Sequence, residues 1–364
     1  RGDEMHNAYA YQYAKNYREL FEQKYGDDHV LYTRGAAPGS QHFACQFGGD
    51  QLTSFQGLKY AIAGGLSAAA SGLPFWGVDA GGYDGFPDQE TYLRWTEYAA
   101  FCPLMRFHGT EPREPWEYDA FTVKVYRYYT WLRENLRPYI VSVAAEAHKL
   151  GIPMMRPLAM MYPEDQEATK VWDEYLFGED LLVAPVSDET EERKIYFPEG
   201  RWISLWNLND EISGPVQRSV EVPIDKIPVY IREGSFLPLR LNENLKLGES
   251  MSESETEMIL AVMPQNDSIV KETLYERSGA KTCCSVEKNG ETIQLQISGR
   301  TAELYVMLAG IHWKNTEAIV NGRTLTKVTA REGLYFTEGY LELEEGILVK
   351  INPSAESVIK IQKK

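Results

Sequence analysis

One pattern in the first third of this chain constrains its fold more than any other feature. Four short apolar runs each end in glycine or a polar residue, and helical segments follow along the chain. Such an alternation predicts parallel βα units. The polar residues fall where the strands end, which is where an α/β barrel carries its active site. The predicted strands are His29–Thr33, 42–47, Pro74–Asp79 and Pro103–Gly109.

The helical segments indicate how much of a barrel the chain can build. Four βα units make half of an eightfold barrel, and an isolated half leaves sheet edges open. The chain also begins in mid-pattern, so we expect a fragment whose missing N-terminal half lies upstream. The predicted helices are His6–Tyr25, Phe55–Gly72, Thr91–Phe101 and two consecutive helices within Tyr118–Gly151, divided at Pro138.

The pattern changes after Gly151. From about Ile152, short strands with turn signals replace the βα units, which is typical of β-sandwiches. The polar stretch Glu243–Glu257 is interpreted as a linker or as a long loop, and a second set of strands follows it. The predicted fold is therefore α/β plus all-β. We expect the C-terminal half of a (β/α)8 barrel in residues 1–151, a proximal β-sandwich in 152–242 and a distal β-sandwich in 243–364.

Composition narrows the range of partners. The chain carries 37 Lys and Arg against 53 Asp and Glu, a net charge of −16, which repels phosphate backbones and anionic lipids. We therefore expect no nucleic-acid partner, and no apolar run is long enough to suggest a membrane span. The four cysteines show neither metal spacing nor a disulfide framework, and no metal or cofactor is expected. Homo-oligomerisation stays open, as does the compartment, for which the cytoplasm is preferred.

The stretch Gln46–Gln51, with the sequence QFGGDQ, is the main candidate for a functional site. Its two glycines let the backbone approach a ligand and hold Asp50 at the end of a strand. Taken alone, a Gly-Asp pair is ordinary turn chemistry. The neighbouring segments favour a site, because each is also an apolar strand followed by glycine and polar or aromatic residues. These segments are Val30–Gly39, Gly72–Gly85 and Pro103–Tyr118.

The order of these motifs resembles glycoside hydrolase family 31, the retaining α-glucosidases, α-xylosidases and their relatives. The resemblance covers about Met5 to Leu239, and the remaining residues are only loosely similar to a distal β-domain. It implies a barrel followed by proximal and distal β-sandwiches, in agreement with the strand pattern. The motifs that carry it are VLYTRGAAPG, QFGGD, FWGVDAGG, MRFHGTEPREPWEY, LRPYI, MMRPLAMMYPED, YLFGEDLLVAPV and PVYIREGSFLPL.

The resemblance implies that Asp50 is the general acid/base. It also implies that Arg34, at the end of the preceding strand, approaches this acid and the sugar hydroxyls. Phe47 stands where the family usually has tryptophan, and would form an apolar wall of altered shape. The family's nucleophilic aspartate belongs to a strand before the first helix, and neither Asp3 nor Glu4 lies in its motif. The resemblance therefore places the nucleophile outside this chain.

Four further residues complete the site that the resemblance implies. His108 matches a histidine that hydrogen-bonds the sugar in the −1 subsite, and Asp79 matches an aspartate of the glycine-rich segment. Trp76 and Tyr83 match aromatics that shape the pocket. Each also has a purely structural interpretation: a core histidine for His108, a turn or cap for Asp79, and packing for the two aromatics.

The chemistry explains why these residue types are needed. Retaining hydrolysis uses two carboxyl groups about 5–5.5 Å apart, a nucleophile and a proton donor that later acts as a base. Asp50 can fill only the second role. We expect an exo-acting hydrolase of terminal α-linked glucose or xylose in an oligosaccharide or other α-glycoside, with the sugar and linkage left open. The alternative is a catalytically inactive fragment that serves as a carbohydrate-binding or scaffold part.

Overall fold

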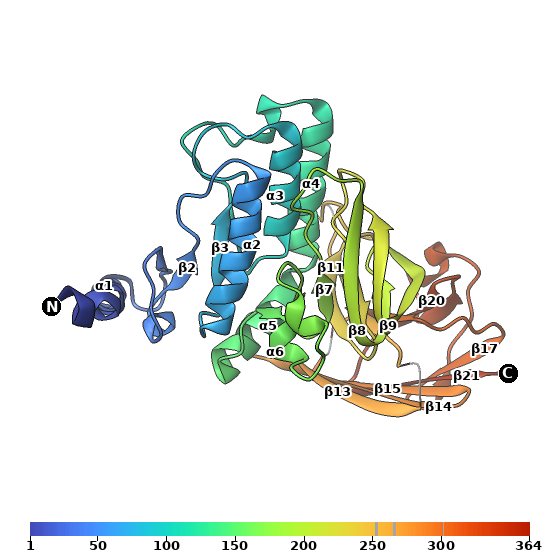
Figure 1. Cartoon of the computed structure of the whole chain (residues 1–364). Helices are drawn as coiled ribbons and strands as arrows, with labels where there is room; N and C mark the ends of the chain where they lie inside the picture. The colour runs from blue at the N-terminus through green and yellow to red at the C-terminus, as the bar shows by residue number, and fades with distance from the viewer. Residues whose placement is uncertain (252–253, 265–266, 301) are drawn as a thin grey trace.

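A four-stranded parallel sheet forms the first part of the protein (Figure 1). The computed structural model describes residues 1–251, 254–264, 267–300 and 302–364. The parallel pairing in chain order confirms the predicted βα units. The four strands are β1 (Tyr32–Thr33), β2 (Cys45–Phe47), β3 (Trp76–Asp79) and β4 (Leu104–Arg106). The helices of this part are α1 (Gly2–Tyr25), α2 (Phe55–Ala70), α3 (Gln89–Ala100), α4 (Ala120–Asn135) and α5 (Arg137–Leu150).

Side-chain caps fix where three of these helices begin. The side chains of Ser54, Asp88 and Asp119 accept hydrogen bonds from the backbone N–H groups at the starts of α2, α3 and α4. Each cap satisfies one of the N–H groups that a helix start leaves without an intrahelical partner. The division between α4 and α5 lies at Leu136, two residues before the predicted point, because proline is tolerated in the first turn of a helix.

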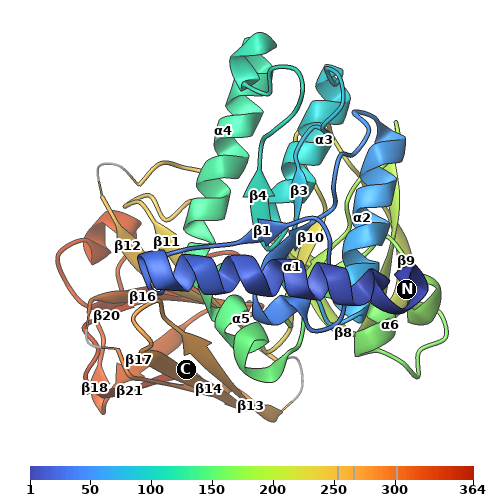
Figure 2. The ribbon, with the colours of Figure 1, turned by 90° about the vertical axis from the view of Figure 1, so that its left-hand side faces the viewer.

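Helix α1 stands apart from the rest of the protein (Figures 1 and 2). It packs on the short 3-10 helix η1 (Ser40–His42), where the ring of Tyr11 meets Phe43 edge-on. Gly26, with a φ of 62°, ends the helix as predicted. Large apolar side chains along α1 are exposed to solvent: Met5, Tyr9, Tyr13, Tyr17, Leu20 and Tyr25. This chain therefore leaves an apolar helix face uncovered.

A second, mixed-length antiparallel sheet begins immediately after α5. Helices α2, α3 and α4 lie between the parallel sheet and the long hairpin β8–β9 of this second sheet (Figure 1). The short helices that follow α5 are α6 (Leu158–Met161) and η3 (Ala168–Lys170). In spatial order the strands are β5 (Met155–Pro157), β6 (Tyr175–Phe177), β7 (Leu181–Val183), β10 (Val229–Arg232), β8 (Glu192–Ser204) and β9 (Asn207–Glu221).

Two further sheets share one apolar core. Ile259 and Val306 of the five-stranded sheet and Val286 and Leu295 of the six-stranded sheet are all fully buried in it. The five-stranded sheet has the order β11 (Phe236–Leu241), β12 (Thr256–Val262), β16 (Leu304–Ala309), β20 (Gly346–Ile351) and β19 (Gly339–Glu342). The six-stranded sheet has the order β13 (Ser268–Tyr275), β14 (Lys281–Asn289), β15 (Thr292–Ser298), β21 (Glu356–Lys363), β17 (Thr316–Val320) and β18 (Arg323–Thr324).

The predicted linker Glu243–Glu257 is a loop in the structure up to Glu255, as far as its described residues go, and its last two residues begin β12; residues 252–253 lie outside the described residues. It joins β11 and β12, which pair antiparallel over their whole length. Its Leu245 and Leu247 pack on the main core, and the N–H of Gly248 donates to the side chain of Asn135. The domain boundary expected at residue 242 thus falls between two strands that pair with each other. The polar composition of the segment suggested a linker, whereas two leucines anchor it as a loop on the core.

Helix α3 joins the parallel sheet to the second sheet. Nearly all of its side chains are buried, including Arg94 and Glu97, which form an ion pair at 3.1 Å. Arg94 also donates to the backbone carbonyls of Val222 and Pro223, which follow β9. A buried charge is tolerated only when it is paired and hydrogen-bonded. These contacts therefore fix α3 against the second sheet. The first part of the protein and the second sheet share one hydrophobic core.

Candidate active site

Strand register brings four of the site side chains to one face of the parallel sheet. Phe47 lies opposite Gly77, and Asp79 lies opposite Arg106. Tyr32 of β1 lies opposite the residue two before Phe47. Side chains two apart on a strand point to the same face. Tyr32, Phe47, Asp79 and Arg106 therefore share the face that is turned away from α2 and α3.

Asp50 lies in the loop directly after β2 and faces solvent. Its carboxylate forms an ion pair with Arg34, from the end of β1, with Nη1 and Oδ2 2.9 Å apart. Gly49 has a φ of 80°, and a Cβ there would lie 2.8 Å from the Arg34 side chain. The glycine is thus required both for the backbone turn and for the passage of the arginine. Because both side chains are about half exposed, this ion pair adds little to stability and mainly sets geometry.

Asp79 is fully buried at the end of β3. Its Oδ1 accepts hydrogen bonds from Nε and Nη2 of Arg106, at 2.6 and 2.5 Å. Burial raises the pKa of the Asp79 carboxyl, and Arg106 opposes that rise. The other oxygen, Oδ2, has no hydrogen-bond partner among the described residues. A buried carboxylate oxygen without a partner is a candidate acceptor for a ligand hydroxyl.

Two aromatic rings support the Arg106 guanidinium. Its central carbon lies 4.9 Å from the ring centroid of Tyr32 and 4.7 Å from that of Phe47. The two rings also contact each other, with centroids 5.1 Å apart. Stacking of this kind favours a guanidinium and restricts where it can move. Phe47 thus presents an apolar ring on this face of the sheet, with the Arg106 guanidinium packed on it.

Tyr83 and His108 meet above the strand ends. Their ring centroids are 5.3 Å apart, and His108 is exposed. Arg113, almost fully buried, fastens the loops that carry them, because its guanidinium donates to the carbonyls of Gly82, Tyr83 and Gly85. The Tyr83 N–H in turn donates to the carbonyl of the residue after Asp50. The loops after β2, β3 and β4 therefore form one connected surface.

Trp76 does not join this group. It lies on β3 with its side chain toward α2, where a Cβ on Gly65 would come within 2.7 Å of the indole Nε1. A Cβ on Gly48 would lie 2.8 Å from the same indole. The reason is strand alternation, which turns Trp76 and Asp79 to opposite faces. The structure thus gathers Arg34, Phe47, Asp50, Asp79, Tyr83 and His108 at the strand ends, and packs Trp76 in the helix layer.

Sequence reasoning placed Arg106 at the end of a predicted strand without giving it a role, and it did not single out Tyr32 or Arg113. The signal for Arg106 was present, because it is an arginine at the end of an apolar strand whose register places it beside Asp79. Tyr32 had a similar signal, being two residues before Arg34 on a predicted strand. Arg113 had no such sequence signal, because its hydrogen-bond partners are backbone carbonyls, which no sequence pattern marks.

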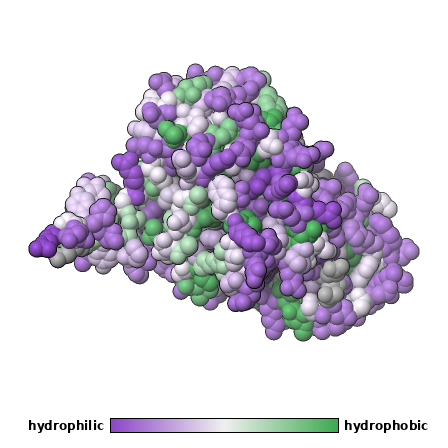
Figure 3. All heavy atoms as spheres, viewed as in Figure 1, coloured by the Kyte–Doolittle hydropathy of each residue, from purple (hydrophilic) through white to green (hydrophobic). Residues whose placement is uncertain are grey.

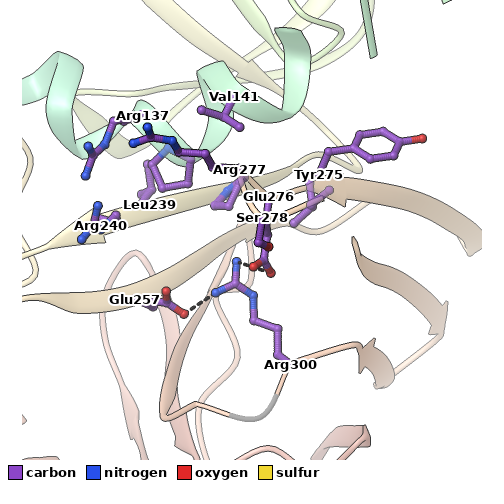
Figure 4. A pocket seen from close by; sticks show the side chains of 13 residues that line it. Arg137, Val141, Leu239, Arg240, Glu257, Tyr275, Glu276, Arg277, Ser278 and Arg300 are labelled. Carbon is purple, nitrogen blue, oxygen red and sulfur yellow. Dashed lines mark hydrogen bonds and ion pairs between the residues drawn. The ribbon is translucent and has the colours of Figure 1, made fainter. Parts of the chain in front are cut away.

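A cavity of about 270 Å³ lies well away from these strand ends, between α5, β11 and β13 (Figure 4). Arginines line it, and one of them, Arg300, pairs with Glu257 and, at 3.6 Å, with Glu276, which also line the cavity. Its floor includes Leu239 and Val141. We place the functional site at the strand ends instead, where a carboxylate and a buried polar atom face outward together.

The remaining surface is largely hydrophilic on the face shown in Figure 3, with apolar side chains in small separate groups. Within the described ranges, no group of three or more His, Cys, Asp or Glu side chains is placed to hold a metal ion. The described helices include none that is long and apolar enough to cross a membrane.

Comparison with known proteins identifies the class of this fold. Residues 1–143 match the model of the glycosyl hydrolase family 31 TIM-barrel domain, and residues 151–237 match that of the family 31 C-terminal domain. The parallel sheet is thus part of a TIM-barrel glycosidase domain. The chain belongs to glycoside hydrolase family 31, which confirms the resemblance found in its motifs.

Individual relatives agree with this assignment. The chain is 32% identical to an isomaltosyltransferase from Sporosarcina globispora, over 98% of this chain and 34% of that protein. It is 35% identical to an α-xylosidase from Saccharolobus solfataricus, over 60% of this chain and 31% of that protein. A cycloalternan-forming enzyme from Listeria monocytogenes, solved with a pentasaccharide substrate, superposes with a TM-score of 0.92 at 26% identity, over 100% of this chain and 36% of that one. The chain therefore spans about a third of the length of these relatives.

Proposed function

We propose that the full-length protein is a retaining α-glycoside hydrolase, exo-acting and of the α-glucosidase or α-xylosidase type. Asp50 is the general acid/base: it protonates the leaving oxygen and later takes a proton from water. The nucleophile is an aspartate outside residues 1–364. The observation that carries this proposal is the placement of Asp50, held by Arg34, beside the buried Asp79–Arg106 pair at the ends of adjacent parallel strands.

The other residues have supporting roles in the proposal. His108 donates to or accepts from a sugar hydroxyl in the −1 subsite, and Tyr83 sets the orientation of its ring. Oδ2 of Asp79 accepts from a second hydroxyl, and Phe47 walls the pocket. A carboxylate paired with an arginine at a solvent-exposed edge suits a step in which a proton moves and charge develops on the sugar. A gap of about 5–5.5 Å to the nucleophile would complete the geometry of retention.

The test is the stereochemistry of the first product. Proton NMR of the full-length protein acting on p-nitrophenyl α-glucoside or α-xyloside should show the α-anomer of the free sugar first. The β-anomer appearing first would contradict retention. Absence of turnover on every α-glycoside tried, with a folded protein, would contradict the glycosidase assignment itself.

A second candidate activity is transfer of the glycosyl group to another sugar instead of to water. One observation supports it: an isomaltosyltransferase and a cycloalternan-forming enzyme are among the relatives that match nearly the whole chain. Retention permits both outcomes, because the glycosyl-enzyme can be opened by water or by a sugar hydroxyl. Chromatography of products from maltose and isomaltose separates them, since transfer yields oligosaccharides longer than the substrate.

We also propose that the β-rich part comprises a proximal β-sandwich domain and a distal one. The two sheets that share the apolar core of Ile259 and Val286 support the distal sandwich. Because β11 pairs with β12, we assign β11 to the distal domain. Removing the segment from β11 onward as one piece should leave the second sheet with its hydrogen-bonded edges unchanged, which amide hydrogen exchange can measure.

A further inference from the structure

Tyr32 has an environment that the roles described above do not explain. Its ring extends from β1 across β2, and its hydroxyl lies against Gly77 of β3, where an added Cβ would come within 2.1 Å of the oxygen. The hydroxyl is buried and has no hydrogen-bond partner among the described residues. Most buried polar side-chain atoms in proteins have a partner, so such an atom needs an explanation.

The unpartnered hydroxyl does not stand alone on this face. Oδ2 of Asp79, two residues beyond Gly77 on the same strand, also lacks a partner within the described part of the chain. Arg106 connects the two residues, because it binds Oδ1 of Asp79 and stacks on the Tyr32 ring. One group is a donor and the other an acceptor. The two groups are thus complementary to a ligand hydroxyl, which can accept from a phenol and donate to a carboxylate.

We infer that Tyr32 is a further substrate-binding residue that helps to determine specificity, and that its hydroxyl and Asp79 Oδ2 together recognise one hydroxyl group of the sugar. This inference rests on the proposed glycosidase function. The ring of Tyr32 keeps a separate positioning role, since it supports the Arg106 guanidinium together with Phe47. Gly77 is the residue that leaves room for the phenol.

The two roles of Tyr32 can be separated by substitution. Tyr32→Phe removes the hydroxyl and keeps the ring against Arg106, whereas Tyr32→Leu removes both. Because Tyr32→Phe deletes a buried hydroxyl that has no partner among the described residues, the melting temperature should stay the same or rise. A hydroxyl that served only the fold would give the opposite result, a fall in melting temperature.

Kinetics of the full-length enzyme on a set of substrates provide the decisive measurement. The set is p-nitrophenyl α-glucoside, its 2-, 3-, 4- and 6-deoxy analogues, and the α-xyloside. Tyr32→Phe should lower kcat/KM on the parent glucoside about 3- to 10-fold, the size expected for one uncharged hydrogen bond. On the single analogue that lacks the recognised hydroxyl, the kcat/KM values of wild type and Tyr32→Phe should agree within about 1.5-fold. The loss of kcat/KM should be larger for Tyr32→Leu than for Tyr32→Phe on every substrate.

Tyr340→Phe is the matched control, because it also removes one buried tyrosine hydroxyl, which donates to the Thr316 carbonyl far from the strand ends. It should leave the kinetics on every substrate unchanged. A loss in Tyr32→Phe that is the same on all substrates, or a lower melting temperature with normal kinetics, would overturn the inference. Either result would assign the hydroxyl to a structural contact.

Failure of the proposed function gives a different result. In that case the wild-type protein turns over none of the substrates. Calorimetric titration of wild type and Tyr32→Phe with glucose and with xylose then carries the test. Weaker binding by the variant, again about 3- to 10-fold, would support Tyr32 as a sugar contact. Equal affinity of the two proteins, or no binding to either, would overturn it.

Discussion

Arg106 binds one oxygen of Asp79 through two of its nitrogens and leaves the other oxygen unpartnered among the described residues. Asp79 is completely buried, whereas Asp50, on the neighbouring strand end, forms its ion pair with Arg34 in solvent. The site thus contains two carboxylate–arginine pairs, one with a fully buried carboxylate and one with an exposed carboxylate. Their different surroundings predict different consequences when each arginine is removed.

Arg106→Met should destabilise the full-length protein by about 3 kcal/mol, because it leaves a buried carboxylate without its counter-ion. The matched change Arg34→Met removes an equally close but exposed partner and should cost less than about 1 kcal/mol. Urea unfolding of both variants at pH 7 measures the difference. Similar losses of unfolding free energy in the two variants would show that burial does not make the two ion pairs differ in their contribution to stability. The pKa of Asp79, already raised by burial, should rise further in Arg106→Met.

Asp50→Asn should lower turnover of natural α-glycosides about 10²- to 10⁴-fold, the usual contribution of a general acid/base. The loss should be smaller on an aryl glycoside or glycosyl fluoride, since those leaving groups depart without protonation. Azide should partly restore turnover of the activated substrate, because a small anion can attack the glycosyl-enzyme without a base. Equal losses on both substrate types, with no azide effect, would indicate a structural role.

A buried pair of carboxyl groups predicts how stability varies with pH. Burial, and then the charge of nearby Asp180, raise the pKa of Glu272 well above its ordinary 4.5, and burial likewise raises that of Asp180. The folded state therefore holds protons that the unfolded state releases above about pH 4.5. Stability should fall as pH rises beyond that value, by at most about 1.4 kcal/mol per pH unit for each proton.

Glu272→Gln should flatten this pH dependence and raise the melting temperature at pH 8, since the amide carries no charge to bury. Glu291→Gln is the control, because Glu291 is exposed and pairs with Lys363 at the surface. Scanning calorimetry between pH 5 and 8 compares the two variants with wild type. If the pH dependence of stability in Glu272→Gln is the same as in wild type, groups other than Glu272 cause it.

Residues 1–364 expressed alone should be catalytically silent and should self-associate. The proposed nucleophile is absent from them, and loss of a nucleophile lowers turnover by several orders of magnitude. The exposed tyrosines of α1, together with Val30 and Leu52 in loops next to the parallel sheet, present apolar surface to solvent. Light scattering and assays on p-nitrophenyl α-glucoside and α-xyloside test both statements. A monodisperse monomer with ordinary enzymatic rates would contradict them.

Local signals in the sequence sufficed for the strands and helices of the first part. Gly26 ended α1 and the glycine-rich pattern of α2 allowed close packing, as Gly64 and Gly65 against Trp76 show. The parallel order followed from the alternation of strands and helices. Trp76 itself shows the limit of such reasoning, because the sequence marks a strand-end aromatic without saying which face it occupies. Only the register with Phe47 and Arg106 decides that.

Long-range pairing was beyond what the sequence could specify. The stretch from 243 to 257 reads as a polar linker, yet Leu245 and Leu247 bury their side chains in the core between paired strands. Arg113 acts through carbonyl groups that every residue possesses, so its role depends on where three loops meet. Likewise, the partners of Arg94 lie more than a hundred residues away in the chain.

The attachment of α3 to the segment after β9 bears on how members of this family can be recombined. The side chains of Arg94 and Tyr129 bind carbonyls and one N–H group of residues 222–227, and Glu97 pairs with Arg94. A chimera that joins one parent's barrel to another's β-domain must therefore match this interface residue by residue. A crossover at position 151, which looks like a natural boundary in the chain, cuts through that shared interior. The fold therefore disfavours exchange of the barrel and the β-domain as independent units.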